Sequence, residues 1–136
     1  PEAISVRSHS MTQNSLMLDS FEKFGLTYDV NTFIPFSSEI VCKPYKHWTN
    51  KLIKVPYFWE DDVHCIYELD WNVEKFLNYS GIKVFDFHPI HIFLNTEHLD
   101  RYEQSRKHHN CEEILTNYVN NGYGSKSFFL DLIREI

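Results

Sequence analysis

Short hydrophobic runs alternate along the chain with segments whose hydrophobic positions follow helical spacing. The hydrophobic runs cover residues 3–8, 27–30, 52–58 and 82–87, and their lengths are typical of β-strands. The last run is hydrophobic at almost every position apart from Lys83 and Asp86. Such a run is typical of a strand that is buried on both faces of a parallel sheet.

Helices are expected between these runs and after them. Asn14 or Ser15 can cap a helix that ends at Lys23, and Gly25 follows it as a stop signal. Asp70 can cap a second helix that continues through residue 79. Three further helices are expected over residues 97–108, 111–120 and 127–136. The alternation predicts an α/β fold with a mainly parallel sheet.

Length and composition favour one ordinary globular domain over residues 1–136. The chain has 43% hydrophobic and 24% charged residues, a balance that can bury a core. The sequence starts at Pro1, without an initiator Met and close to a predicted strand. We therefore expect that part of the N-terminal portion of the fold is missing.

Charge and cysteine content exclude several classes of protein. The formal net charge of −6 argues against nucleic-acid binding, which needs clustered Lys and Arg. No hydrophobic run approaches the roughly 20 residues that span a bilayer. Cys42, Cys65 and Cys111 are too widely spaced for a zinc knuckle or a disulfide framework. Reduced thiols in a cytoplasm-like compartment are expected.

Three predicted strands end in clusters of titratable residues. In parallel α/β sheets, ligands bind at the carboxyl ends of the strands. Because hydrophobic cores have no use for such side chains, the pattern predicts one shared site. The clusters are Arg7-Ser8-His9, Trp59-Glu60-Asp61-Asp62 and His88-Pro89-Ile90-His91.

Each cluster also has a purely structural interpretation. His9 could hydrogen-bond a neighbouring carboxylate, and Asp61 and Asp62 could simply begin a helix, where acids are favoured. In an extended chain the rings of His88 and His91 would point to opposite faces, although a bend could bring them together. The high aromatic content, 16%, suits a Phe- and Tyr-rich core as well as sugar stacking. The remaining histidines are expected at the surface or in loops: His47, His64, His98, His108 and His109.

Residues 6–13 resemble the His-Ser/Thr-x-x-His motif of the polysaccharide deacetylases, carbohydrate esterase family four. The deacetylase-like proteins of lipopolysaccharide O-antigen gene clusters are still more similar, over nearly the whole chain. That similarity includes residues 7–9, 28–29, 56–62, 87–91, 94–96, 122–124 and 128–129.

The resemblance implies a partial or distorted (β/α) barrel that hydrolyses N-acetyl groups on a sugar or surface polysaccharide with a divalent metal, commonly zinc. It places His9 on the first metal-binding histidine and Gln13 on the second. Asp61 and Asp62 fall in the acidic motif that orients catalytic groups, and His88 falls on the acid that protonates the leaving amine. Their neighbours are candidate substrate-binding residues: Arg7, Trp59, Glu60 and His91.

The chain also departs from the family pattern. An amide oxygen at Gln13 is a weaker metal ligand than imidazole, and the family's leading Asp pair has no counterpart before His9. Its Arg-containing motif has no match in residues 28–36. We therefore expect the isolated chain to bind metal weakly or not at all. The alternative to an enzyme is a catalytically inactive carbohydrate-binding or scaffolding domain. An open sheet edge would favour a homo-oligomer.

Overall fold

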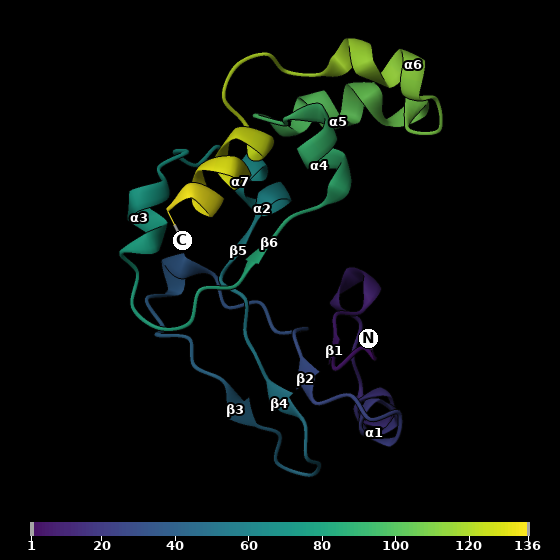
Figure 1. The fold of residues 1–136 in the computed structure, drawn as a ribbon, viewed down its shortest axis with the longest axis vertical. Coiled ribbons are helices and arrows are strands. Elements are labelled where there is room, and N and C mark those ends of the chain that lie inside the picture. Colours follow the sequence, from purple (N-terminus) through teal and green to yellow (C-terminus); the bar gives the residue numbers. More distant parts are fainter. Residues whose placement is uncertain (1, 136) are drawn as a thin grey trace. The chain divides into compact units, whose positions relative to one another are not determined.

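The computed structural model describes residues 2–135, which form two compact units (Figure 1). The strand unit comprises Pro1–Trp59 and Tyr79–Phe85, and the helical unit comprises Glu60–Asn78 and Asp86–Ile136. The chain therefore passes between the units three times. The expectation of a single domain over residues 1–136 stays a prediction.

A four-stranded sheet organises the strand unit. Its order is β1 (Ser5–Val6), β2 (Tyr28–Asp29), β4 (Ile53–Lys54) and β3 (Tyr45–Lys46). The β1–β2 and β2–β4 pairs are parallel, whereas β3 is antiparallel to β4. The prediction of a mixed α/β fold with a mainly parallel sheet is confirmed. Over residues 2–135 this sheet ends at β1 and β3 without closing, so the predicted barrel is not confirmed.

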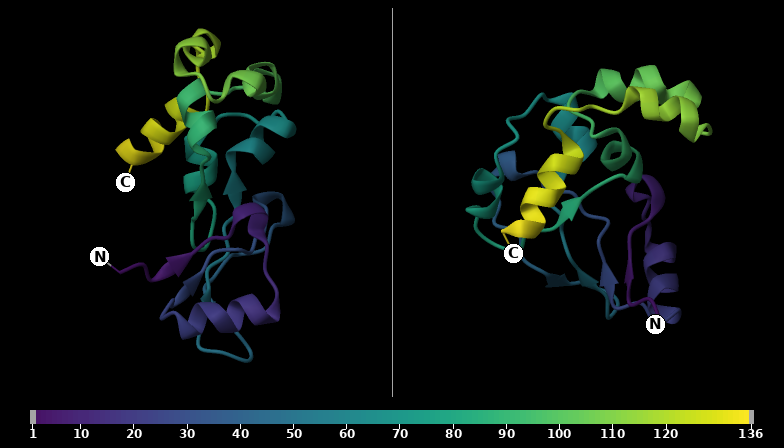
Figure 2. Two further views of the ribbon diagram at one scale, coloured as in Figure 1. Left: turned by 90° about the vertical axis from the view of Figure 1, so that its right-hand side faces the viewer. Right: turned by 45° about the horizontal axis from the view of Figure 1, so that its top comes forward.

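Helix α1 (Ser15–Lys23) has the predicted bounds and the predicted cap. Asn14 Oδ1 accepts a hydrogen bond of 3.0 Å from the backbone N–H of Met17. Gly25 ends the helical segment with a φ of 79°, a left-handed conformation that glycine adopts without strain. In the right view of Figure 2, α1 runs alongside the segment that leads from β1.

The strand predicted over residues 52–58 is shorter than expected, because within this range the chain forms only β4, and β5 (Trp59–Glu60) follows directly after it. Only β4 belongs to the main sheet, and β5 pairs with β6 (Phe85–Asp86) in a second, two-stranded sheet. Pro56 lies between β4 and β5 and has no N–H to donate to a neighbouring strand, which explains the interruption between them. The hydrophobic pattern alone could not show this change of partner.

The strand unit also contains two 3₁₀ turns and isolated β-bridges. The turns are η1 (His9–Met11), which follows β1, and η2 (Phe36–Ser38). A bridge joins Cys42 to Gly81. A Cβ on Gly81 would lie 2.4 Å from the carbonyl oxygen of Cys42, so this close approach requires glycine.

The helical unit contains two short helices; the first was only an alternative interpretation of Asp61 and Asp62 in the sequence, and the second was not predicted. These are α2 (Asp61–Ile66) and α4 (Pro89–Leu94). Helix α3 is capped by Asn72 rather than by Asp70, because Asn72 Oδ1 accepts from the N–H of Lys75 at 3.0 Å. The predicted end of the last helix, residue 136, lies outside the described residues. The remaining elements are α3 (Val73–Leu77), α5 (Leu99–Ser105), η3 (Arg106–His108), α6 (Glu112–Leu115), η4 (Thr116–Tyr118) and α7 (Ser125–Arg134).

His64 lies in the core of the helical unit, which corrects its expected place at the surface. Its ring is 3.9 Å from the ring centroid of Trp71, and it also packs near Phe76 and Phe128. Burial lowers the pKa of His64 to about 4, so the ring is neutral at physiological pH. Histidine is thus used here as an aromatic core residue.

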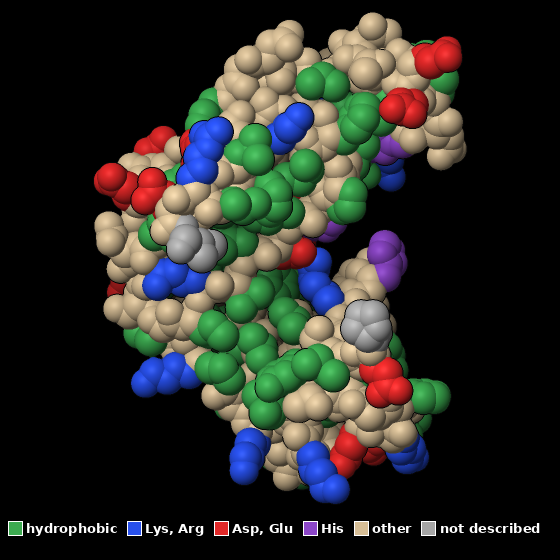
Figure 3. Space-filling model, in the orientation of Figure 1, with side chains coloured by type: hydrophobic (Ala, Val, Ile, Leu, Met, Phe, Trp, Pro, Cys, Tyr) green, Lys and Arg blue, Asp and Glu red, His purple; other side chains and the backbone are tan. Residues whose placement is uncertain are grey.

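One face of the helical unit carries a hydrophobic groove of about 760 Å³, and Figure 3 shows hydrophobic side chains gathered on this face. None of the helices over residues 2–135 is long and hydrophobic enough to cross a membrane. The homo-oligomer expected from the sequence stays a prediction. The groove is lined by Phe87, Pro89, Ile92, Phe93, Thr116, Val119, Lys126 and Phe129.

Candidate functional site

Asp61 and His88 form a two-point contact in the helical unit. His88 Nδ1 lies 2.7 Å from Asp61 Oδ1, and the backbone N–H of His88 donates to Asp61 Oδ2 at 2.8 Å. Asp61 begins α2, and His88 is the residue before α4. Because both the ring and the backbone of His88 are held, the orientation of its imidazole is fixed.

The carboxylate of Asp61 is fully buried and has its hydrogen-bonding capacity filled. Besides the two contacts from His88, Oδ1 accepts from the N–H of Asp62 at 2.9 Å and Oδ2 from the hydroxyl of Ser125 at 3.3 Å. A carboxylate offers about four acceptor positions, and all four are in use. Asp61 can therefore orient His88, but it has no lone pair left to accept a proton from water or to bind a metal.

His88 is held in its charged form. The hydrogen bond to Asp61 raises the pKa of His88 to about 9, and the charges of Asp61, Asp62 and Asp86 act in the same direction against burial. The other ring nitrogen, Nε2, lies 3.8 Å from Glu60 Oε1, and the side chain is 35% exposed. His88 is thus an imidazolium at neutral pH that solvent can still reach.

His91 has the opposite character. It is buried within α4, its Nδ1 lies 3.1 Å from the hydroxyl oxygen of Thr96, and burial lowers its pKa. Its ring centroid is 5.8 Å from that of His88. The two rings are neighbours because Pro89 starts a helix, at a position that proline favours, instead of continuing an extended chain.

The other predicted residues of this region have structural contacts. Asp62 Oδ1 accepts from the N–H of Val63 at 2.6 Å, so both acids occupy the first turn of α2 as their structural interpretation proposed. Trp59 is 1% exposed and packs on Phe85, which makes it a core residue rather than a sugar-stacking surface. Glu60 is also buried.

His9, Arg7 and Gln13 belong to the strand unit. His9 is exposed in η1, and the Arg7 guanidinium lies 5.0 Å from the ring centroid of Tyr57. The strand unit thus contains His9, whereas the helical unit contains His88. The predicted joint site of these residues stays a prediction.

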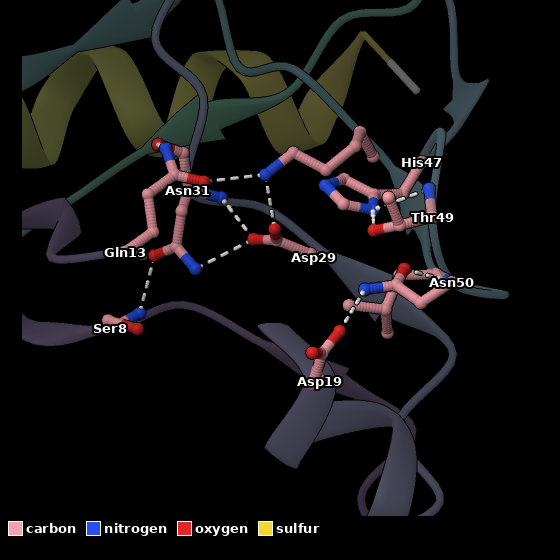
Figure 4. A network of polar contacts seen from close by, with 10 residues as sticks. Ser8, Gln13, Asp19, Asp29, Asn31, His47, Thr49 and Asn50 are labelled. Atoms are coloured by element: carbon pink, nitrogen blue, oxygen red, sulfur yellow. Dashed lines mark hydrogen bonds and ion pairs between the residues drawn. The ribbon is translucent and has the colours of Figure 1, made fainter. Parts of the chain in front are cut away.

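Lys54 is buried beside Asp29, and the sequence pattern did not predict this contact. The Lys54 ammonium contacts Asp29 Oδ2, and it donates to Gln13 Oε1 at 2.6 Å. Asn31 completes the network by donating from Nδ2 to Asp29 Oδ1 at 2.7 Å (Figure 4). A lysine inside the hydrophobic run over residues 52–58 was the available signal, since a buried charge requires a partner.

The predicted metal ligands His9 and Gln13 do not fit a divalent metal in this arrangement. The amide oxygen of Gln13 already accepts from the Lys54 ammonium. A metal ion bound to this oxygen at about 2.1 Å would lie within about 5 Å of the ammonium. The two cations would then repel each other by roughly 7 kcal/mol at an effective dielectric constant of about 20.

Two residue groups in the helical unit have the composition of a metal site: Asp61, His88 and His91, and Glu60, Asp86 and His88. In the first group all acceptor positions of Asp61 are filled. In the second, the hydrogen bond to Asp61 and the charges of the nearby acids raise the pKa of His88 to about 9. A metal ion at this place would therefore have to compete with a proton for the imidazole ring, because ligating histidine is neutral.

Residues 1–106 match the family of WbmS-like polysaccharide deacetylases, and the chain belongs to this family. A similar solved structure is that of WbmS from Bordetella bronchiseptica, classed among polysaccharide deacetylases and assigned to O-antigen biosynthesis. The two chains are 42% identical with a TM-score of 0.88, over 100% of this chain and 57% of WbmS. The chain thus spans little more than half the length of WbmS. No curated protein matches it.

Proposed function

We propose that this chain takes part in the hydrolysis of N-acetyl groups on a sugar or surface polysaccharide, with His88 as the acid that protonates the departing amine. The observation that carries the proposal is the two-point contact between Asp61 and His88. It fixes the ring and keeps it protonated while leaving part of it exposed. Membership of the deacetylase family supports a carbohydrate substrate.

The reaction adds water to the acetamide carbonyl and breaks the carbon–nitrogen bond, which gives acetate and a free amino sugar. The amine cannot leave as an anion, so it needs a proton as the bond breaks. His88 can supply this proton from Nε2, because Nδ1 faces Asp61. Asp61 then stabilises the charge and tautomer of the ring, as a buried carboxylate does for histidine in other hydrolases.

The metal implied by the family would polarise the carbonyl and lower the pKa of the attacking water. Because His9 and Gln13 do not fit a metal in the arrangement described above, no step of the proposal depends on it. Among the predicted substrate-binding residues, Arg7 has an exposed side chain, whereas Trp59, Glu60 and His91 are buried. Arg7 is therefore the residue of this set that we propose contacts the saccharide.

One observation favours the alternative of a catalytically inactive carbohydrate-binding domain. Gln13 stands where the family pattern has a metal-binding histidine, and its amide oxygen is committed to Lys54. A chain of this kind would bind saccharide without releasing acetate.

Acetate release and saccharide binding, measured on the same samples, distinguish the two functions. N-acetylglucosamine oligosaccharides are incubated with the chain, with and without added zinc, and compared with His88→Asn. His98→Asn is the matched control, because His98 is an exposed histidine of the same unit. The proposal is supported if the wild-type chain and His98→Asn release acetate and His88→Asn does not. Release that persists in His88→Asn contradicts the acid role, and binding without release favours the inactive domain.

A further inference from the structure

We infer that the Lys54 ammonium is a built-in cation that holds the loop carrying His9, because it binds Gln13, the residue that stands where the family pattern has a metal-binding histidine. The loop runs from Ser8 to Gln13 and is attached at both ends to Asn31, which follows β2. The backbone N–H of Ser8 donates to Asn31 Oδ1 at 2.7 Å, and Gln13 Nε2 donates to the carbonyl oxygen of Asn31 at 3.2 Å (Figure 4).

Backbone pairing fixes the position of the cation. Asp29 and Lys54 are opposite residues of the adjacent parallel strands β2 and β4. Their side chains are 0% and 5% exposed, so the ion pair is closed off from solvent. A buried ammonium needs a carboxylate and further acceptors, and here Asp29 and Gln13 supply them.

The same cation fixes the orientation of the Gln13 amide. Its oxygen must face the ammonium, and its NH₂ group then faces the carbonyl of Asn31. A flipped amide would direct N–H groups at a positive charge, so only one orientation satisfies both partners. Asn31 is 2% exposed and its own amide bonds Asp29 and Ser8, which makes the loop and the ion pair one network.

This network does for the loop what a metal would do, since one central cation gathers oxygen atoms from the loop and from a strand. The difference is that the cation is covalently part of the protein and carries one charge instead of two. Lys54 is therefore a positioning residue for the His9 loop, and the loop holds its conformation without metal. The inference does not depend on the proposed hydrolysis.

The first experiment titrates the wild-type chain with zinc alone and follows the His9 imidazole by NMR. We expect no saturable shift of His9. The inference would be overturned if zinc bound stoichiometrically and shifted the His9 resonances, and if His9→Ala abolished this binding. This measurement needs no destabilising variant.

The second experiment compares two double variants by zinc calorimetry. Gln13→His/Lys54→Met removes the buried ammonium and leaves the Asp29 carboxylate next to an added imidazole. Gln13→His/Lys51→Met is the control with the same change in net charge, because the Lys51 side chain is 94% exposed. We expect at least tenfold tighter zinc binding in the first variant. Equal affinity in both folded variants contradicts the inference, and a variant that does not fold leaves the wild-type titration decisive.

Discussion

The two units each hold a buried carboxylate beside a cationic side chain, but they use the pair differently. In the strand unit, Asp29 and Lys54 are both almost completely buried and lie opposite each other on neighbouring strands. In the helical unit, Asp61 is buried but the His88 side chain remains 35% exposed. A closed pair stabilises the fold. A pair whose cation reaches solvent can also exchange a proton, and this difference is the reason for proposing His88, rather than Lys54, as an acid.

The largest loss of stability is expected when the cation of the buried Asp29–Lys54 pair is removed. Lys54→Met leaves the buried Asp29 carboxylate without its cation, which should destabilise the chain by about 3–5 kcal/mol. Denaturant unfolding measures the loss. Lys51→Met, which removes an exposed lysine, should change stability by less than about 0.5 kcal/mol. If Lys54→Met also lowers the free energy of unfolding by less than about 1 kcal/mol, the ion pair of Asp29 and Lys54 is not a main source of stability in the strand unit.

The next effect is expected from Asp61→Asn in the helical unit. The new NH₂ group would face hydrogen-bond donors that now donate to a carboxylate oxygen. This mismatch should cost about 2 kcal/mol of stability. The variant also removes the main cause of the high pKa of His88. We expect its NMR titration midpoint to fall clearly below about 9, because the largest upward cause is removed while burial, which lowers the pKa, remains. A midpoint that stays near 9 would assign the shift to other acids.

The wild-type chain should lose stability at alkaline pH through His88. Its pKa is about 9 in the folded state and about 6.5 when unfolded, so the stabilisation is complete below about pH 6.5. It is lost as the pH rises through 9. After allowance for solvent screening of a partly exposed ring, we expect a loss of about 1–2 kcal/mol. Unfolding at pH 6 and pH 10 measures it, and His88→Asn should remove this pH dependence.

The smallest effect is expected from Gln13→Ala. It removes one acceptor from Lys54 but leaves the ion pair with Asp29 intact, so we expect a loss of about 1 kcal/mol. Gln104→Ala, at an exposed glutamine of α5, is the control and should be nearly neutral. Thermal unfolding compares the two. A loss as large as that of Lys54→Met would mean that the amide, rather than Asp29, is the main partner of the ammonium.

Local signals in the sequence determined several features correctly. The cap at Asn14 and the stop at Gly25 define α1, because both act on residues within a few positions of themselves. The short motifs around His9, Asp61 and His88 were enough to predict the deacetylase family, which residues 1–106 confirm. Alternating hydrophobic runs and helices predicted the mixed fold and its mainly parallel sheet.

Other features depend on contacts between distant residues, and only the tertiary structure decided them. Gln13 and Lys54 are 41 positions apart, and sequence spacing does not show that they meet. The pairing of Asp61 with His88 likewise spans 27 positions, and it turns two plausible catalytic residues into an oriented pair. Whether a charged side chain is closed off or accessible depends on what covers it. Sequence therefore named the residue types of the candidate site, and the tertiary structure decided which of these side chains are buried, paired or exposed.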